Sequence, residues 1–109
     1  MKLLLHAITQ VRDQEAFMAE KIHGPRFDSF SQGYTALAEE IQEAQDEIRI
    51  VDKCQDMLLR LMRSGQTARA EKVEDVLFDL EQHALLAACE MVQVAYVAGK
   101  MMRSLEGWK

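Results

Sequence analysis

The 109-residue sequence has few of the residues that interrupt regular structure or cross-link a small fold. It contains one proline, five glycines and two cysteines. So few chain breaks argue against a fold of many short strands joined by turns. Cys54 and Cys89 have neither a CxxC spacing nor the spacing of a disulfide framework, which favours reduced thiols in a cytoplasmic protein.

A basic surface and a long apolar run are also missing. The formal net charge is −5, whereas nonspecific binding to nucleic acid needs clustered lysine and arginine residues. The apolar run at residues 3–5 is too short for the core of a signal peptide. No run of about 18 apolar residues predicts a membrane span. We therefore expect a cytoplasmic protein with neither nucleic acid nor membrane as a partner.

Hydrophobic residues instead recur at helical spacing, which predicts an all-α fold. A first helix is expected over about residues 3–22. It stops at the sequence HGPRF, residues 23–27, because glycine and proline both end helices. Asp28 or Ser29 then provides the cap of a second helix. We expect all of residues 1–109 to form one domain.

The two remaining helices are longer and carry apolar residues at alternating steps of four and three. The second helix ends near Gly65, and Thr67 is expected to cap the third. This pattern predicts a long antiparallel helical hairpin with the first helix packed on it. A bend near residues 51–56 or 80–84 stays open, since periodicity alone does not exclude it.

The third helix contains an unusually apolar segment. Residues 84–99 read ALLAACEMVQVAYVAG and hold a single charged side chain, Glu90. A helix that is apolar on nearly all sides is covered on nearly all sides, by its own fold or by a second subunit. We therefore expect a homo-oligomer, a dimer or tetramer, that completes the bundle. A carboxylate in such a segment must be protonated, paired or bound to a metal.

The second helix contains an acidic segment, EEIQEAQDE, at residues 39–47. At 100° per residue, Glu39 and Asp46 point away from the apolar stripe. Glu40 and Glu47 lie at its edge, with Glu43 next to them. A solvated helix face is the ordinary interpretation of such a segment. Against it, the acids at 39, 43 and 47 repel one another across single turns, and a cation would relieve that repulsion.

The hairpin predicts a partner for these acids. Glu40 lies 25 positions before Gly65 and Glu90 lies 25 positions after it. In an unbroken antiparallel hairpin these two carboxylates meet at the same height, with Glu43 one turn nearer the hairpin's end. Divalent cations such as Mg²⁺ prefer oxygen ligands of this kind.

Three segments of the sequence resemble a known family. These are the EExxE motif at residues 39–43, the preceding HGPRFDSFSQGYTALA and the later ACEMVQVAYVAG. They resemble MazG-like proteins of the all-α NTP pyrophosphatase superfamily. The resemblance implies that Glu40, Glu43 and Glu90 bind metal and that Glu39 belongs to the catalytic set. Gln93 takes the position of the family's fourth ligand, which is usually aspartate.

The resemblance also implies a reaction. It is the hydrolysis of a nucleoside triphosphate to the monophosphate and pyrophosphate with Mg²⁺, or alternatively Mn²⁺, as cofactor. Basic residues should help to hold the phosphates, and Lys100, Lys21 and Arg26 are the candidates. The alternative for each of these three residues is a plain surface position.

Other interpretations remain beside this one. Gln93 is a neutral amide, which keeps open a catalytically inactive MazG-like dimer that serves as an interaction or accessory module. The spacing Glu20-x-x-His23 is used by di-iron bundles, but those sites need a second such pair, and the sequence has none. His83 is expected to be a packed or surface histidine, and Tyr34 is expected in the core.

Overall fold

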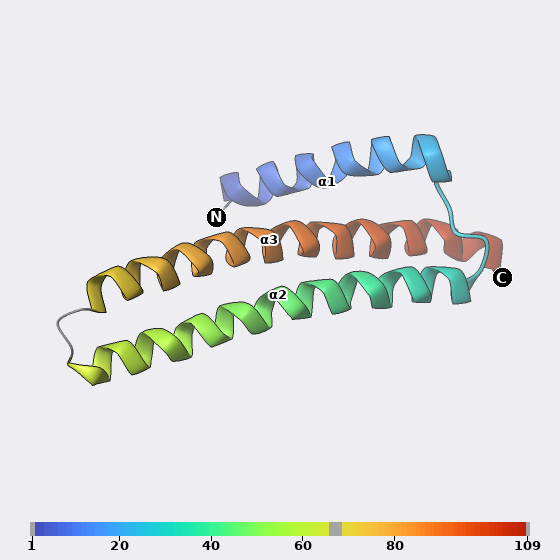
Figure 1. Cartoon of the computed structure of the whole chain (residues 1–109). Helices are drawn as coiled ribbons and strands as arrows, with labels where there is room; N and C mark the ends of the chain where they lie inside the picture. The colour runs from blue at the N-terminus through green and yellow to red at the C-terminus, as the bar shows by residue number, and fades with distance from the viewer. Residues whose placement is uncertain (1, 66–68, 109) are drawn as a thin grey trace. The chain divides into compact units, whose positions relative to one another are not determined.

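The structure, a computed structural model, describes residues 2–65 and 69–108. It consists of helices α1 (Lys2–His23), α2 (Phe30–Ser64) and α3 (Arg69–Ser104), followed by a short 3-10 helix, η1 (Leu105–Trp108) (Figure 1). The described ranges contain no strand, so the prediction of an all-α fold is confirmed. Both long helices run without a break. Thr67, the predicted cap of α3, lies outside the described residues.

Local hydrogen bonds explain the break between α1 and α2. Gly24 adopts a φ of 81°, and its N–H donates to the Glu20 carbonyl at 3.0 Å, which closes α1 with a left-handed residue. Ser29 is the cap of α2, because its Oγ accepts a hydrogen bond from the Gln32 N–H at 3.1 Å. Gln32 in turn accepts one from the Asp28 N–H at 2.7 Å. This exchange resembles a capping box and decides between the two predicted caps.

The chain divides into two compact units. The first unit comprises Met1–Gln42 and Glu90–Lys109, and it groups α1 with the beginning of α2 and the end of α3, alongside which α1 lies in Figure 1. The second unit, Glu43–Cys89, contains the remaining turns of α2 and α3. Within the second unit the two helices lie side by side. His83 Nδ1 of α3 is 2.6 Å from Glu47 Oε2 of α2, so His83 is a paired and partly buried residue.

The second unit has a narrow core, because two helices share only one seam. Its described buried hydrophobic residues are Ala44, Cys54 and Val76. By contrast, the side chain of Met62 is 67% exposed and that of Phe78 is 62% exposed. A two-helix unit therefore leaves large apolar side chains in water unless something else covers them.

In the first unit, α1 presents small and polar residues to its neighbours. Its half-buried residues are Thr9, Arg12, Ala16, Ala19 and Glu20. The apolar stripe of α1 is instead exposed, and it consists of Leu4, Ile8, Val11, Met18 and Ile22. Tyr34 is exposed as well and stacks on Phe30 with ring centroids 6.5 Å apart. The expectation that Tyr34 lies in the core is therefore wrong for the single chain.

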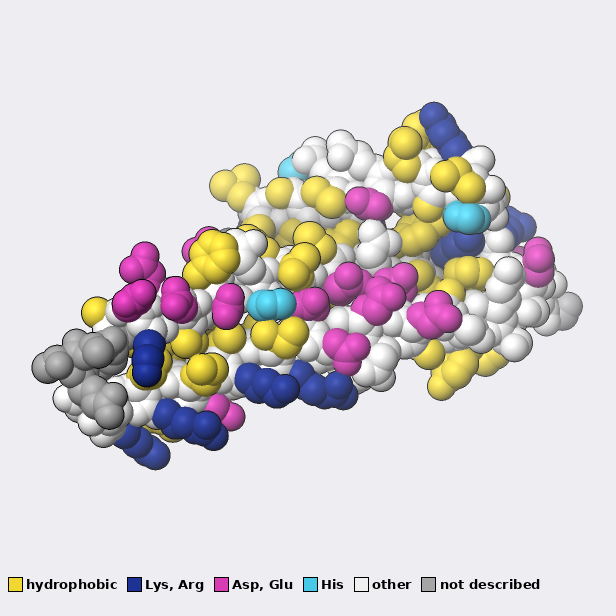
Figure 2. Space-filling model, viewed as in Figure 1, with side chains coloured by type: hydrophobic (Ala, Val, Ile, Leu, Met, Phe, Trp, Pro, Cys, Tyr) yellow, Lys and Arg dark blue, Asp and Glu magenta, His cyan; other side chains and the backbone are white. Residues whose placement is uncertain are grey.

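The exposed area of the chain is large for its mass. The accessible surface is 8371 Å², whereas a folded monomer of 12.5 kDa exposes about 6,200 Å². Figure 2 shows hydrophobic side chains spread over the visible surface. The difference of about 2,200 Å² is the amount of surface that an ordinary fold would cover.

One helix is long and apolar enough to cross a membrane when only length and composition are considered. It is the segment Ala70–Trp108, which includes most of α3. A single helix of this kind is weak evidence, because the core helix of a soluble protein meets the same criteria.

Candidate functional site

Three carboxylates of α2 and α3 come together. Glu40 and Glu90 belong to the first unit, and Glu43 follows Glu40 by one turn of the unbroken helix. One oxygen from each carboxylate lies within 4.8 Å of the others. We call these three residues the carboxylate group. Glu40 and Glu90 are half-buried, whereas Glu43 is exposed.

Helix geometry accounts for the grouping. Residues three apart on a helix share a face, which brings Glu43 beside Glu40. Glu90 reaches them from α3. The convergence predicted from the equal distances to Gly65 is thus present in the structure. Glu39 is exposed and is not one of the three, since it lies about 100° around the helix from Glu40.

The spacing of the carboxylate group suits a small divalent cation. Octahedral Mg²⁺ binds oxygen at about 2.0–2.1 Å, which separates its ligand oxygens by about 2.9–4.2 Å. Oxygens already within 4.8 Å reach this range through small side-chain movements. In the described part of the chain, no other set of three His, Cys, Asp or Glu side chains has comparable spacing.

Gln93, the predicted fourth ligand, contacts a different helix. Its Nε2 donates a hydrogen bond to Glu15 Oε2 of α1 at 3.2 Å. Only the Oε1 atom of this amide can serve as a metal ligand. Glu15 was not anticipated from the sequence, because periodicity does not show which residues of α1 face α3.

The three basic residues predicted to hold phosphate occupy two environments. Lys100 is only 5% exposed, so its alternative as a plain surface residue is wrong. Lys100 and Arg26 both line a cavity of about 370 Å³ in the first unit, together with His23. We call it the Lys100 cavity. Lys21 does not line it; its Nζ lies 4.4 Å from the centre of the Phe17 ring.

A set of hydrogen bonds fixes one wall of the Lys100 cavity. The Phe27 N–H donates to Ser104 Oγ at 2.9 Å, and Ser104 Oγ donates to the Lys100 carbonyl at 2.7 Å. Trp108 Nε1 donates to the Phe27 carbonyl at 3.3 Å. The Phe27 ring is thereby held next to Lys100, whose Nζ is 4.4 Å from the ring centre. No spacing in the sequence predicts this arrangement, which joins residues 77 positions apart.

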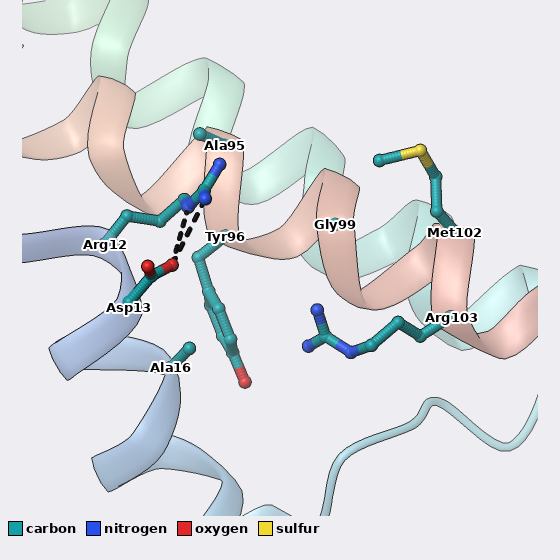
Figure 3. Close-up of a pocket in the computed structure, with 8 residues that line it drawn as sticks. All are labelled: Arg12, Asp13, Ala16, Ala95, Tyr96, Gly99, Met102 and Arg103. Carbon is teal, nitrogen blue, oxygen red and sulfur yellow. Dashed lines mark hydrogen bonds and ion pairs between the residues drawn. The ribbon is translucent and has the colours of Figure 1, made fainter. Parts of the chain in front are cut away.

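Tyr96 is shared by the Lys100 cavity and a second cavity of about 290 Å³ (Figure 3). Burial raises the pKa of Tyr96; the negative charge of Glu20 raises it further, and Arg103 opposes these effects. In the second cavity Arg12 pairs with Asp13 at 3.1 Å. Arg103 pairs with Glu20 at 2.6 Å. Glu20 therefore forms an ion pair with Arg103. The described residues give no support to a di-iron site.

Comparisons with protein-family models, curated proteins and solved structures each found no match. The resemblance to MazG-like proteins consequently stays a prediction.

Proposed function

We propose that this chain is a Mg²⁺-dependent hydrolase that cleaves nucleoside triphosphates to the monophosphate and pyrophosphate. The observation that carries the proposal is the convergence of Glu40, Glu43 and Glu90 within 4.8 Å. Three carboxylates concentrate negative charge that a divalent cation neutralises, and phosphate oxygens are the ligands such a cation recruits in nucleotide hydrolases. Mn²⁺ prefers the same oxygen ligands and is the natural substitute.

Each residue has a distinct task in this proposal. Glu40 and Glu90 anchor the cation from two helices, and Glu43 completes the set from the exposed side. Gln93 offers a neutral oxygen one turn after Glu90. Glu39 lies outside the carboxylate group, where it would act on the water around the substrate. When bound, the cation supplies charge neutralisation and a water of lowered pKa.

The direct test is pyrophosphate release from a panel of ribo- and deoxyribonucleoside triphosphates with Mg²⁺. We expect turnover of at least one of them. Glu90→Gln should lower kcat/KM by more than about 100-fold, the upper end of what supporting groups cost a metal site. Glu74→Gln, an exposed change on the same helix, is the matched control. Absence of turnover with every nucleotide would refute the proposal.

The same proposal includes self-association in the cytoplasm. The chain exposes about 2,200 Å² more than a monomer of its mass. Two copies that covered this surface would form an interface of about 4,400 Å², within the range of obligate homodimers. A second copy is also the partner that would turn the two helices of Glu43–Cys89 into a four-helix bundle.

One observation favours a second candidate, a non-catalytic interaction module. Gln93 binds Glu15 through its amide, as a residue with a purely structural task would. Self-association without nucleotide turnover, and with no response to Mg²⁺, would identify this candidate.

A further inference from the structure

We infer that the Lys100 cavity binds a phosphate-type anion, and that in the proposed enzyme this anion is part of the polyphosphate chain of the substrate. The assignment of the anion to a nucleotide rests on the proposed function. The binding of the anion itself does not, because it follows from the charges that line the cavity.

Lys100 is the main reason for the inference. Its side chain is one of the two buried polar or charged residues in the described chain. Among the described residues no carboxylate forms an ion pair with its ammonium group, which lies over the Phe27 ring. A buried ammonium without a counter-ion is unfavourable, and the face of an aromatic ring offsets only part of the loss. An anion in the adjoining cavity would supply the missing charge.

The other polar residues of the cavity fit the same ligand. Arg26 and His23 bring further cationic or donor groups, and Asp28 is the single acid among them. The Tyr96 hydroxyl is buried and has no hydrogen-bond partner in the described structure, and Tyr96 lines this cavity as well as the one in Figure 3. Charged and hydroxyl donors of this kind are typical of phosphate sites.

The neighbouring cavity in Figure 3 is a useful contrast. Its two arginines, Arg12 and Arg103, each already pair with a carboxylate. The positive charges of this cavity are therefore already balanced, and neither arginine needs an anion as a counter-ion. The Lys100 cavity differs because its buried cation has no such partner.

The position of the Lys100 cavity relates it to the carboxylate group. Ala36 lines the cavity and lies four residues before Glu40 on α2. At 1.5 Å per residue this is about 6 Å along the helix, within the length of a polyphosphate chain. A nucleotide whose metal-bound phosphates lie at Glu40 and Glu90 would thus extend its remaining anionic oxygens toward Lys100.

The test uses inorganic pyrophosphate and isothermal titration calorimetry in EDTA, so that metal binding at the carboxylate group makes no contribution. We expect the wild-type chain to bind pyrophosphate, and Lys100→Met to bind it at least tenfold more weakly. Lys21→Met is the matched control and should bind as the wild type does. Tyr96→Phe should weaken binding by a smaller factor, since it removes one donor. Circular dichroism establishes that each variant is folded, and Lys100→Gln replaces Lys100→Met if the latter is not.

Two results would overturn the inference. One is a wild-type chain that does not bind pyrophosphate in EDTA, and the other is equal binding by the folded Lys100 variant. Failure of the proposed function can be distinguished from both of these results. Glu90→Gln should bind pyrophosphate in EDTA with the affinity of the wild type. A chain that hydrolyses no nucleotide but binds pyrophosphate through Lys100 would have the anion site without the catalytic activity.

Discussion

Replacement of Glu90 by glutamine should stabilise the metal-free protein and remove its stabilisation by Mg²⁺. At 4.8 Å, the upper limit on the separation of the three carboxylate oxygens, two unit charges repel by about 0.9 kcal/mol in a water-like medium and by about 3.5 kcal/mol at an effective dielectric constant of 20. Glu90 takes part in two of the three pairs within the carboxylate group. The lower value applies to Glu43, which is exposed, because salt screens its charge. Removal of this repulsion alone should therefore contribute about 2 kcal/mol to the free energy of unfolding.

Mg²⁺ should stabilise the wild type and leave the stability of Glu90→Gln unchanged. At ten times its Kd, a cation that binds only the folded state stabilises it by about 1.4 kcal/mol. For a chain of this length that corresponds to a rise in Tm of about 6 °C. The wild type should show this rise and Glu90→Gln should not. Glutamine keeps the length of glutamate and one oxygen acceptor, and it replaces the other oxygen with an NH2 donor, so the substitution removes the charge with little change in side-chain size.

Thermal unfolding at one fixed protein concentration, with Mg²⁺ or with EDTA, measures both effects. Glu74→Gln should respond to Mg²⁺ as the wild type does. A Glu90→Gln variant that is less stable than the wild type in EDTA would contradict the predicted repulsion. Equal stabilisation of the variant and the wild type by Mg²⁺ would contradict a metal site at Glu90.

Three further outcomes are expected. Ser104→Ala leaves the Phe27 N–H without its acceptor and should lower the free energy of unfolding in urea by about 1–3 kcal/mol; an unchanged value would contradict that role. Because burial raises the pKa of Tyr96, its neutral phenol contributes stability fully below about pH 10, and this contribution is lost as the pH rises through the raised pKa. Tyr96→Phe should flatten the fall in stability at alkaline pH, and Tyr34→Phe, an exposed control, should not. Phe78→Glu should shift a wild-type dimer or tetramer toward monomer in light scattering after gel filtration; a monomeric wild type that partitions into lipid vesicles would point to a membrane instead of a second copy.

The helices and their ends could be predicted from the sequence because their causes are local. Gly24 and Ser29 form hydrogen bonds with backbone groups no more than four residues away. The turn between α1 and α2 can therefore be predicted from the sequence. The pairing of Glu40 with Glu90 also follows from local rules once the hairpin is assumed, because equal distances from Gly65 put both residues at one level.

The surroundings of Lys100 could not be predicted in this way. The position of Phe27 depends on Ser104 and Trp108, and no spacing rule links residues so far apart. Periodicity also marks Tyr34 as apolar without showing whether its own chain covers it, and here it does not. Hydrophobic patterns identify surfaces that need a partner, but they do not say which chain supplies that partner.

The connection of Phe27 to Ser104 has a consequence for the order in which the molecule forms. The first unit combines residues up to Gln42 with residues from Glu90 onward, whereas Glu43–Cys89 is continuous in sequence. On a ribosome, the continuous unit has all of its residues before the discontinuous one does. The wall of the Lys100 cavity cannot form until Ser104 and Trp108 have been synthesised, because both residues form hydrogen bonds with Phe27. Premature termination shortly before Ser104 would therefore leave most of the helical content intact and still prevent assembly of the cavity.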